Sequence, residues 1–450
     1  MERPWEAAAA SPRSPPALSE LRRHRKNPNT VLELFPDTAE VVGGDLVVGG
    51  VGVNALAEEF GTPLVVYCEE TVRAAARAYR RGAPDAVIVY GTKAFPNVAL
   101  MRVLSEEGIG ADVSTLGELR YAQAAEVQAE RIVVHGNNKS DEELAAAAEA
   151  GVWLVVMDEP GEVERCVAAG VKRVLLRVTP GIETGGHAAI QTAHVGSKFG
   201  VRAEEAVEVI RRGVEAGLEV LGLHVHLGSQ LLDESPARAA IAWLAEFAGR
   251  ARAEIGWTPE IVNLGGGLGI QYVADEPAPP SPEEYAASLV SSLNHAWTLQ
   301  NLPRPQVVLE PGRSLVGRAG FTLYRVGVVK RAGGTTWVAV DGGMSDNPRP
   351  ALYGARYAAL LANRADESAA GTFAVCGKHC ESGDVLIERA ELPEPSRGDL
   401  LAVPATGAYT LAMASNYNAL LHPTAALVGR RSRRLLRHGE TIDALLATEA

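Results

Sequence analysis

Short apolar runs alternate with amphipathic stretches of helical periodicity from Val65 to about residue 312, and this alternation limits the possible folds most strongly. It is the pattern of repeated βα units, whose strands form a parallel sheet. Eight strands are expected, at residues 86–93, 110–115, 131–136, 153–158, 173–178, 219–228, 260–267 and 305–312. Eight such units in about 230 residues favour a closed (β/α)8 TIM barrel over an open sheet.

Helix starts can be recognised between several of these strands. A hydroxyl residue followed three positions later by a glutamate forms a capping box, which satisfies free N–H groups at a helix N-terminus. Three pairs fit this pattern: Thr115 with Glu118, Ser140 with Glu143, and Ser281 with Glu284.

Beyond Gly312 the pattern changes to strand-like runs separated by Gly, Pro and Asp turns, which is typical of an all-β domain. The fold class is therefore α/β plus all-β. We expect a disordered extension at 1–30, a segment at 31–60 that adds a strand to the β domain, a barrel at 61–315 and the β domain, a sandwich or barrel, at 316–450.

Charge and cysteine content narrow the classes of function. The formal charge of -12 disfavours binding to nucleic acid or to anionic lipid. The sequence contains no apolar run of about 18 residues, so it predicts no membrane span. Four scattered cysteines are too few for a disulfide framework, and no second Cys/His pair completes a metal site with Cys376 and Cys380. We expect a cytoplasmic protein without a bound metal.

Polar or glycine residues stand at the carboxyl ends of five of the eight predicted strands, where barrel enzymes place their active sites. These residues are Lys93, His135 and Asn137, His224, His226 and Ser229, Gly265 to Gly267, and Glu310 with Arg313. A single charged residue in such a position is usually solvated, but five strands with the same feature indicate a site.

Each of these residues also has a plain structural explanation. Lys93 ends an apolar strand, where loss of hydration would lower its pKa and give a nucleophilic amine. The same sequence pattern is expected for a lysine whose side chain extends into solvent at the barrel rim. The three glycines, with Ser229 and Arg313, could bind a phosphate group. Three glycines are also common in ordinary loops. His224 and His226 face one side of their strand and could equally be core residues.

Nine strings together resemble the diaminopimelate decarboxylases of the alanine-racemase-like (fold-type III) class of pyridoxal-phosphate enzymes. The resemblance covers residues 35–440, and it departs from the family before SKFG and near residue 422. The strings, in order, are YGTKAF, HGNNK, SKFG, GLHVHLGSQ, NLGGGLGI, EPGRSLVG, DGGMSDNPRPALY, CESGD and GAYTLAMASNYN.

The resemblance implies pyridoxal 5'-phosphate as the cofactor and a homodimer with shared active sites. It implies that Lys93 binds the cofactor covalently, that His226 stacks on its ring and that Glu310 faces its pyridine nitrogen. Cys380 matches a proton donor that the family supplies from the other subunit. The remaining matches are cofactor-binding residues (Ser229, Gly265, Gly266, Gly267, Gly312, Arg313 and Tyr409) and substrate-binding residues (Arg313, Arg349, Tyr353, Glu381 and Tyr409).

The implied reaction is decarboxylation of meso-2,6-diaminopimelate to L-lysine, the last step of lysine biosynthesis. An arginine such as Arg349 would bind the second carboxylate of this substrate, and Glu381 would bind the second ammonium. One alternative is a decarboxylase or racemase of the same fold acting on ornithine, arginine or carboxynorspermidine, which would not need Arg349. Another is a catalytically silent carrier or regulator, which would be expected to lose Lys93 or Cys380.

Overall fold

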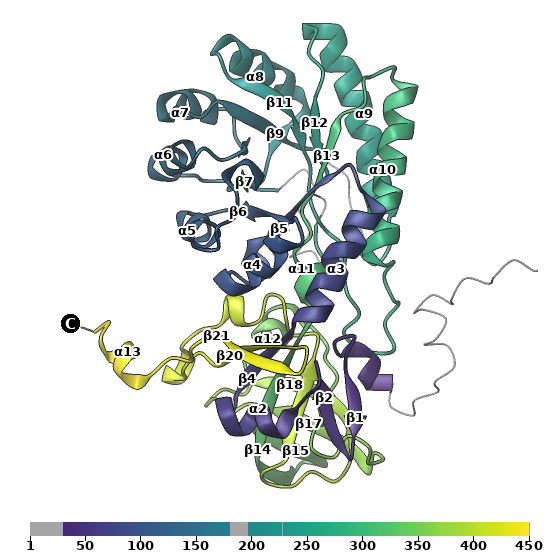
Figure 1. Ribbon diagram of the computed structural model, residues 1–450, viewed down its shortest axis with the longest axis vertical. Coiled ribbons are helices and arrows are strands. Elements are labelled where there is room, and N and C mark those ends of the chain that lie inside the picture. The colour runs from purple at the N-terminus through teal and green to yellow at the C-terminus, as the bar shows by residue number, and fades with distance from the viewer. Residues whose placement is uncertain (1–29, 181–196, 227, 450) are drawn as a thin grey trace, which may run out of the picture.

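The computed structural model describes residues 30–180, 197–226 and 228–449, and in it the eight expected strands close into a parallel barrel (Figure 1). Pairing of β9 with β8 closes the ring. The predicted extension, apart from residue 30, lies outside the described residues. The barrel strands are β5 (Val87–Gly91), β6 (Gly110–Val113), β7 (Ile132–Val134), β8 (Leu154–Met157), β9 (Arg173–Thr179), β11 (Glu219–His224), β12 (Ile261–Asn263) and β13 (Gln306–Leu309); the short β10 (Val201–Arg202) pairs with β9.

Eight helices surround this ring: α3 (Glu69–Gly82), α4 (Val98–Glu106), α5 (Leu116–Ala124), α6 (Asp141–Ala150), α7 (Glu162–Ala169), α8 (Ala203–Glu215), α9 (Ser235–Ile255) and α10 (Pro282–Leu299). The capping boxes predicted at Ser140 and Ser281 are confirmed. The one at Thr115 is incomplete, because the Glu118 carboxylate accepts from Ser114 N instead. Among the described residues, no helix has the length and apolar character needed to cross a bilayer.

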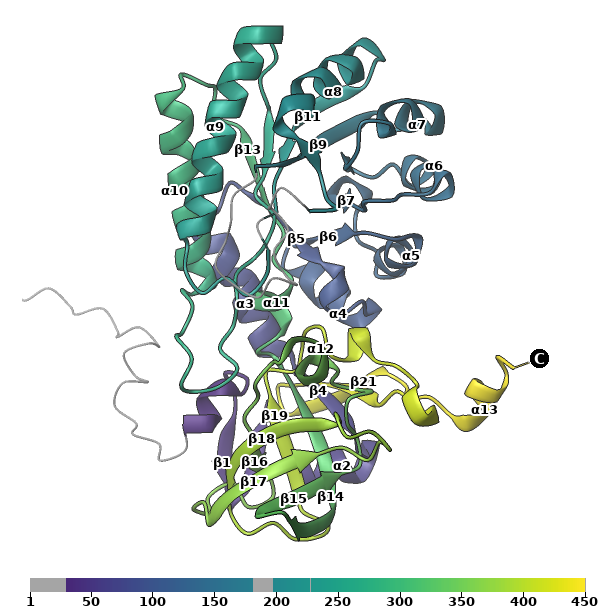
Figure 2. The same cartoon turned by 180° about the vertical axis from the view of Figure 1, so that it is seen from behind.

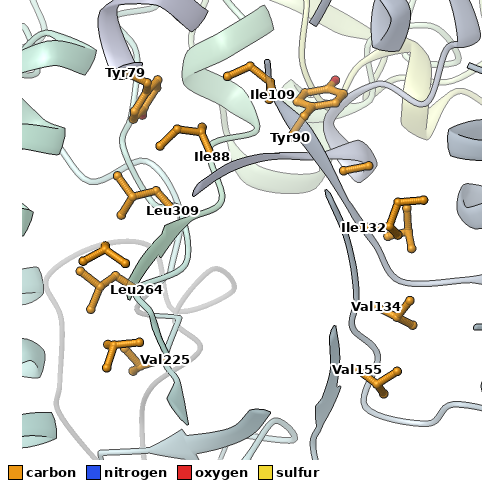
Figure 3. Packing of buried hydrophobic residues seen from close by; sticks show 14 of the residues in the cluster. Tyr79, Ile88, Tyr90, Ile109, Ile132, Val134, Val155, Val225, Leu264 and Leu309 are labelled. Carbon is orange, nitrogen blue, oxygen red and sulfur yellow. The ribbon is translucent and has the colours of Figure 1, made fainter. Parts of the chain in front are cut away.

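Alternation along the barrel strands separates two apolar layers. Val89 belongs to a cluster inside the ring, whereas its neighbours Ile88 and Tyr90 belong to the larger cluster between strands and helices. Figure 3 shows side chains of this outer cluster around the ring of strands. The inner cluster consists of Val89, Val133, Leu154, Val156, Leu175, Ile261 and Val308. The barrel is therefore filled by side chains below its carboxyl end, and that end is left for polar groups.

The remaining strands form a second, sheet-rich body next to the barrel (Figure 2). Its nine-stranded sheet has the order β18-β17-β15-β14-β4-β20-β21, with β19 pairing with β14 and β16. The strands are β4 (Leu64–Cys68), β14 (Gly320–Ala332), β15 (Thr335–Val340), β16 (Leu360–Leu361), β17 (Gly371–Cys376), β18 (Val385–Leu392), β19 (Leu400–Pro404), β20 (Thr424–Gly429) and β21 (Ser432–Arg437). Two short helices, α12 (Arg349–Tyr353) and α13 (Ile442–Leu446), belong to this part of the chain, whereas α11 (Arg313–Val316) directly follows β13 and packs against α3 of the barrel.

The N-terminal strand of the β-domain sheet comes from residues just after the 31–60 segment and not from the segment itself. Residues 40–52 form a small sheet of their own, β1 (Glu40–Val42), β2 (Asp45–Val48) and β3 (Val51–Gly52), followed by α2 (Val53–Phe60). Both edges of β2 pair within this small sheet, which is joined to the β domain by backbone hydrogen bonds such as that from Leu46 N to Ala362 O at 2.7 Å. The inserted strand is β4, which is buried throughout and pairs with β14 and β20. The domain limits remain predictions.

A buried ion pair links the loop after β7 to the start of α7. Lys139 Nζ lies 2.9 Å from Glu162 Oε1, and both side chains are 1% exposed. Removing one partner leaves the other charged group buried, so Lys139→Met is expected to lower the free energy of unfolding by about 3 to 5 kcal/mol. Chemical denaturation would measure this. The double variant Lys139→Met/Glu162→Met should be less destabilised than Lys139→Met alone, and equal losses would contradict the explanation.

Candidate functional site

Five polar side chains from five strands meet at the carboxyl end of the barrel: Asp112, His135, His224, Asn263 and Glu310. Glu310 is at their centre. His135 Nε2 lies 2.6 Å from Glu310 Oε1, His224 Nε2 lies 3.4 Å from Oε2, and Asn263 Nδ2 donates to Oε1 at 2.5 Å. Each residue lies in the last two residues of its strand or directly follows it, so the closed ring of parallel strands brings them together.

The electrostatics of this cluster keep one carboxylate ionised. Burial acts to raise the pKa of Glu310, but His135 and His224 outweigh it and hold that pKa well below its usual range. Burial lowers the pKa of His224 to about 3, against the attraction of Glu310. Burial also raises the pKa of Asp112, against the attraction of His135. Glu310 can therefore act as a fixed anion facing the barrel mouth.

Lys93 lies directly after β5 in the short helix η2 (Thr92–Ala94). Its side chain remains accessible to water. Desolvation by the surrounding barrel groups acts to lower its pKa, but electrostatic attraction to Asp112, Tyr409 and Glu310 raises it overall. The net direction therefore differs from the lowering expected from lost hydration alone, because the negative charges of two carboxylates from other strands outweigh the desolvation.

The three glycines after β12 form a backbone cradle with no room for side chains. Gly265 and Gly267 have φ of +66° and +102°, a region that favours glycine. A Cβ on Gly265 would lie 2.6 Å from His226 Nδ1, and one on Gly266 would lie 2.3 Å from the Glu310 carbonyl oxygen. The glycines thus let the loop pass close to two predicted site residues.

Arg313, the first residue of α11, connects several predicted site residues. Its guanidinium donates to Ser229 Oγ at 2.9 Å and lies 4.7 Å from the ring centroid of Tyr409. Tyr409 N in turn donates to Ala94 O at 2.9 Å, next to Lys93. A Cβ on Gly312 would lie 3.2 Å from the Tyr409 hydroxyl. The β domain thus places Tyr409 against the barrel mouth.

Arg349 and Tyr353 begin and end α12 in the β domain. Arg349 is 6% exposed, and its guanidinium donates to the Tyr357 hydroxyl at 2.6 Å and lies 4.4 Å from the ring centroid of Tyr272. The Tyr272 hydroxyl also accepts a hydrogen bond from Arg313. The side chain of Tyr272 therefore lies between Arg349 and Arg313 of the barrel site. Tyr353 is half-buried.

Cys380 and Glu381 lie apart from this group in the chain described. Both are exposed, in the loop between β17 and β18. Cys380 N donates to Asn418 Oδ1 at 3.0 Å, and Glu381 Oε2 accepts from the Tyr417 hydroxyl at 3.3 Å. Within the described ranges, no contact joins either residue to Lys93.

His226 is half-buried near the glycine loop, where its Nδ1 lies 3.3 Å from Gly266 N. Burial, and after it the charges of Lys93 and Arg177, hold the pKa of His226 well below its usual value. Its plane is within 14° of that of His224, with centroids 6.5 Å apart.

Three residues of the site were missed from sequence: Asp112, Arg177 and Asn263. Each is a buried polar residue inside a predicted strand, and in the structure each lies within the last three residues of its strand, β6, β9 or β12. Arg177 is buried and lies 3.4 Å from Asp158. Because β6 and β12 end earlier than the sequence predicts, Asp112 and Asn263 did not stand out as strand-end residues.

The ligand atoms of His135, His224 and Glu310 all lie within 4.8 Å of one another, as in a metal site. However, the 2.6 Å contact between His135 and Glu310 is a hydrogen bond, which uses the atoms a metal would need. This cluster is therefore better suited to holding the Glu310 carboxylate.

Comparison with known proteins identifies the family. The model described as "Pyridoxal-dependent decarboxylase, pyridoxal binding domain" matches residues 69–317. Proteins named diaminopimelate decarboxylase from Actinosynnema pretiosum subsp. auranticum and Bacillus subtilis strain 168 are 43% and 40% identical to this chain. These matches cover 92% and 89% of this chain and 95% and 94% of the relatives.

A solved structure shows the same overall fold. The crystal structure of diaminopimelate decarboxylase from M. jannaschii in complex with L-lysine superposes with a TM-score of 0.85 at 33% identity. The match covers 92% of this chain and 98% of that one. On sequence, fold and near-complete coverage together, the chain belongs to the diaminopimelate decarboxylase family of pyridoxal-dependent decarboxylases.

Proposed function

We propose that this protein is a diaminopimelate decarboxylase, which removes one carboxylate of meso-2,6-diaminopimelate as CO2 and releases L-lysine in the last step of lysine biosynthesis. Family membership supports the reaction. The observation that carries the choice of substrate is Arg349, a buried guanidinium one side chain from Arg313 and paired with no acidic group in the described part of the chain. Such a cation suits the second carboxylate of this substrate.

Pyridoxal 5'-phosphate is the cofactor of this family. The glycine loop, Ser229 and Arg313 fit its phosphate, because the loop presents backbone where any side chain would clash. Glu310 fits its protonated pyridine nitrogen, because His135 and His224 keep that carboxylate ionised. When bound, the cofactor supplies an acceptor for the electrons left as CO2 departs.

The roles of individual residues are part of the proposal. Lys93 holds the cofactor covalently, the neutral ring of His226 stacks on it, and Glu310 keeps its ring nitrogen protonated. Cys380 donates the proton that replaces the lost carboxylate. The other cofactor contacts are Ser229, Gly265, Gly266, Gly267, Gly312, Arg313 and Tyr409, and the substrate contacts are Arg313, Arg349, Tyr353, Glu381 and Tyr409.

A homodimer with shared sites is also proposed. Cys380 and Glu381 are exposed and have their polar contacts within the β domain, so they are available to a second subunit. We place the protein in the cytoplasm, because all four cysteines are free thiols, which suits a reducing compartment.

Decarboxylation of ornithine, arginine or carboxynorspermidine is the alternative. These substrates have no second carboxylate at the far end, so they would leave Arg349 without a partner. Measuring CO2 release from a panel of these amino acids and meso-diaminopimelate, with and without added pyridoxal phosphate, separates the two. Release from ornithine or arginine but not from meso-diaminopimelate would reject the proposal. No release from any of them would favour a silent protein.

Arg349→Ala is expected to lower kcat/KM for meso-diaminopimelate by roughly 30- to 1000-fold while leaving cofactor binding nearly intact. The reason is that the variant loses a charge-assisted contact in an enclosed site, which costs about 2 to 4 kcal/mol of transition-state stabilisation. Arg356→Ala is the matched control, because Arg356 is exposed and pairs with Asp275 at the surface. Equal efficiencies of the two variants would show that Arg349 does not bind substrate.

A further inference from the structure

Three tyrosines and two arginines alternate in one continuous series of contacts, which we name the Arg–Tyr ladder: Tyr409, Arg313, Tyr272, Arg349 and Tyr357. The Arg313 guanidinium carbon lies 4.7 Å from the ring centroid of Tyr409 and 5.9 Å from that of Tyr272. The Arg349 carbon lies 4.4 Å from the centroid of Tyr272 and 5.7 Å from that of Tyr357. The rings of Tyr272 and Tyr357 meet edge to face at 5.3 Å.

The two guanidiniums of the ladder are buried without acidic partners. Arg313 and Arg349 are 7% and 6% exposed, and neither forms an ion pair within residues 30–180, 197–226 and 228–449. Their polar contacts are to hydroxyls: Ser229 and Tyr272 for Arg313, and Tyr357 for Arg349. Burying a cation is costly unless it is compensated. Here the faces of aromatic rings compensate in part, and an anionic ligand would complete the compensation.

Tyr272 is the one member of the ladder that contacts both arginines. Its hydroxyl accepts a hydrogen bond from Arg313, and its ring lies beside Arg349. It is 4% exposed, in the loop between β12 and α10. Two contacts fix that loop: Ile270 N donates to Gln230 Oε1 at 3.2 Å, and Tyr272 N donates to Glu276 Oε2 at 3.1 Å. This loop of the barrel thus carries Tyr272 into the apolar core of the β domain, between Arg313 and Arg349.

We propose that Tyr272 is a specificity-determining positioning residue, which holds Arg313 and Arg349 at the spacing that fits the distal carboxylate of the substrate. The inference rests on the proposed function and adds to it a residue that acts through the arginines. Tyr357 positions Arg349 in the same way, because its hydroxyl accepts a hydrogen bond from that arginine. The ladder therefore selects ligands with a carboxylate at the end remote from Lys93.

Two ligands that differ by one carboxylate test the proposal by binding alone. L-lysine keeps the distal carboxylate, and 1,5-diaminopentane lacks it. Their dissociation constants would be measured by titration calorimetry on the cofactor-loaded protein. For Tyr272→Leu we expect L-lysine to bind roughly 10- to 100-fold more weakly, because both the ring face and the hydroxyl are lost. Binding of 1,5-diaminopentane should change by less than about twofold.

Tyr272→Phe and Tyr357→Phe keep the rings and remove one hydroxyl each. Each variant should therefore bind L-lysine roughly 3- to 10-fold more weakly than the wild type. If Tyr272→Leu does not fold, these two variants carry the test. Tyr121→Leu is the control for removal of a tyrosine, since Tyr121 is exposed on α5. Equal weakening of both ligands would mean a merely structural role and would overturn the proposal, as would unchanged L-lysine binding.

The design separates this inference from the proposed function. CO2 release from meso-diaminopimelate by the wild-type protein tests the function, and the binding comparison does not need turnover. A wild-type protein that binds L-lysine no more tightly than 1,5-diaminopentane would overturn the ladder proposal even if decarboxylation were observed. A selective loss of L-lysine binding without turnover would retain the ladder and reject the function.

Discussion

Lys93→Ala is expected to lower kcat for meso-diaminopimelate by roughly ten-thousand-fold or more, the largest single-residue effect we anticipate. Lys93 is the one amine placed among Asp112, Glu310 and Tyr409 at the barrel mouth in the described structure. No other side chain there could form the covalent link to the cofactor. The wild-type protein should be yellow, and borohydride reduction should fix a pyridoxyl group on Lys93, detected by peptide mass spectrometry.

The matched control is Lys172→Ala, since Lys172 is exposed at the opposite end of β9 from the site. It should retain colour, activity and the label on Lys93. The Lys93→Ala protein should release all of its cofactor on dialysis after reduction. Finding the pyridoxyl group on another lysine of the wild-type protein would contradict the assignment of Lys93.

The barrel was predictable because two independent signals agree on it. Ile88, Val89 and Tyr90 show the period of a strand, and Lys93 shortly after them marks the end at which polar groups gather. The same logic applies to Glu310 after β13. Both the strand and its site residue can thus be predicted from a few neighbouring residues, without knowledge of contacts between distant parts of the chain.

What could not be predicted depends on contacts between distant parts of the chain. β4 has the apolar pattern of a barrel strand, but its neighbours β14 and β20 come more than 250 residues later. The sign of the pKa shift of Lys93 depends on Asp112 and Glu310, which belong to other strands. Tyr272 lies in a loop, and its meaning appears only when Arg349 of the β domain packs against it.

The positions of Cys380 and Glu381 mark a second limit. The family resemblance assigns both to the active site, whereas in the chain described they are exposed and contact Asn418 and Tyr417. A residue that completes the site of another subunit would look like this in a single chain. Its role stays a prediction, and a measurement on two subunits together is needed to test it.

Mixed dimers of Lys93→Ala and Cys380→Ala provide that measurement. Each homodimer should be nearly inactive, because every site lacks either the covalent attachment or the proton donor. If Cys380 crosses the interface, twofold symmetry gives each mixed dimer one site with both defects and one site with neither. When subunits exchange at random, about half of the dimers are mixed, so about one site in four is intact. Activity should therefore recover from near zero to about a quarter of wild type.

Native mass spectrometry must first show that mixed dimers have formed, because slow subunit exchange would also leave the mixture inactive. A mixture of Lys93→Ala with Lys93→Ala/Cys380→Ala is the control, since none of its sites can be intact. If mixed dimers form and activity stays at the level of the separate variants, Cys380 serves the site of its own subunit or none. The exposed loop between β17 and β18 would then have to move toward Lys93 within one chain, and the shared-site model would be rejected.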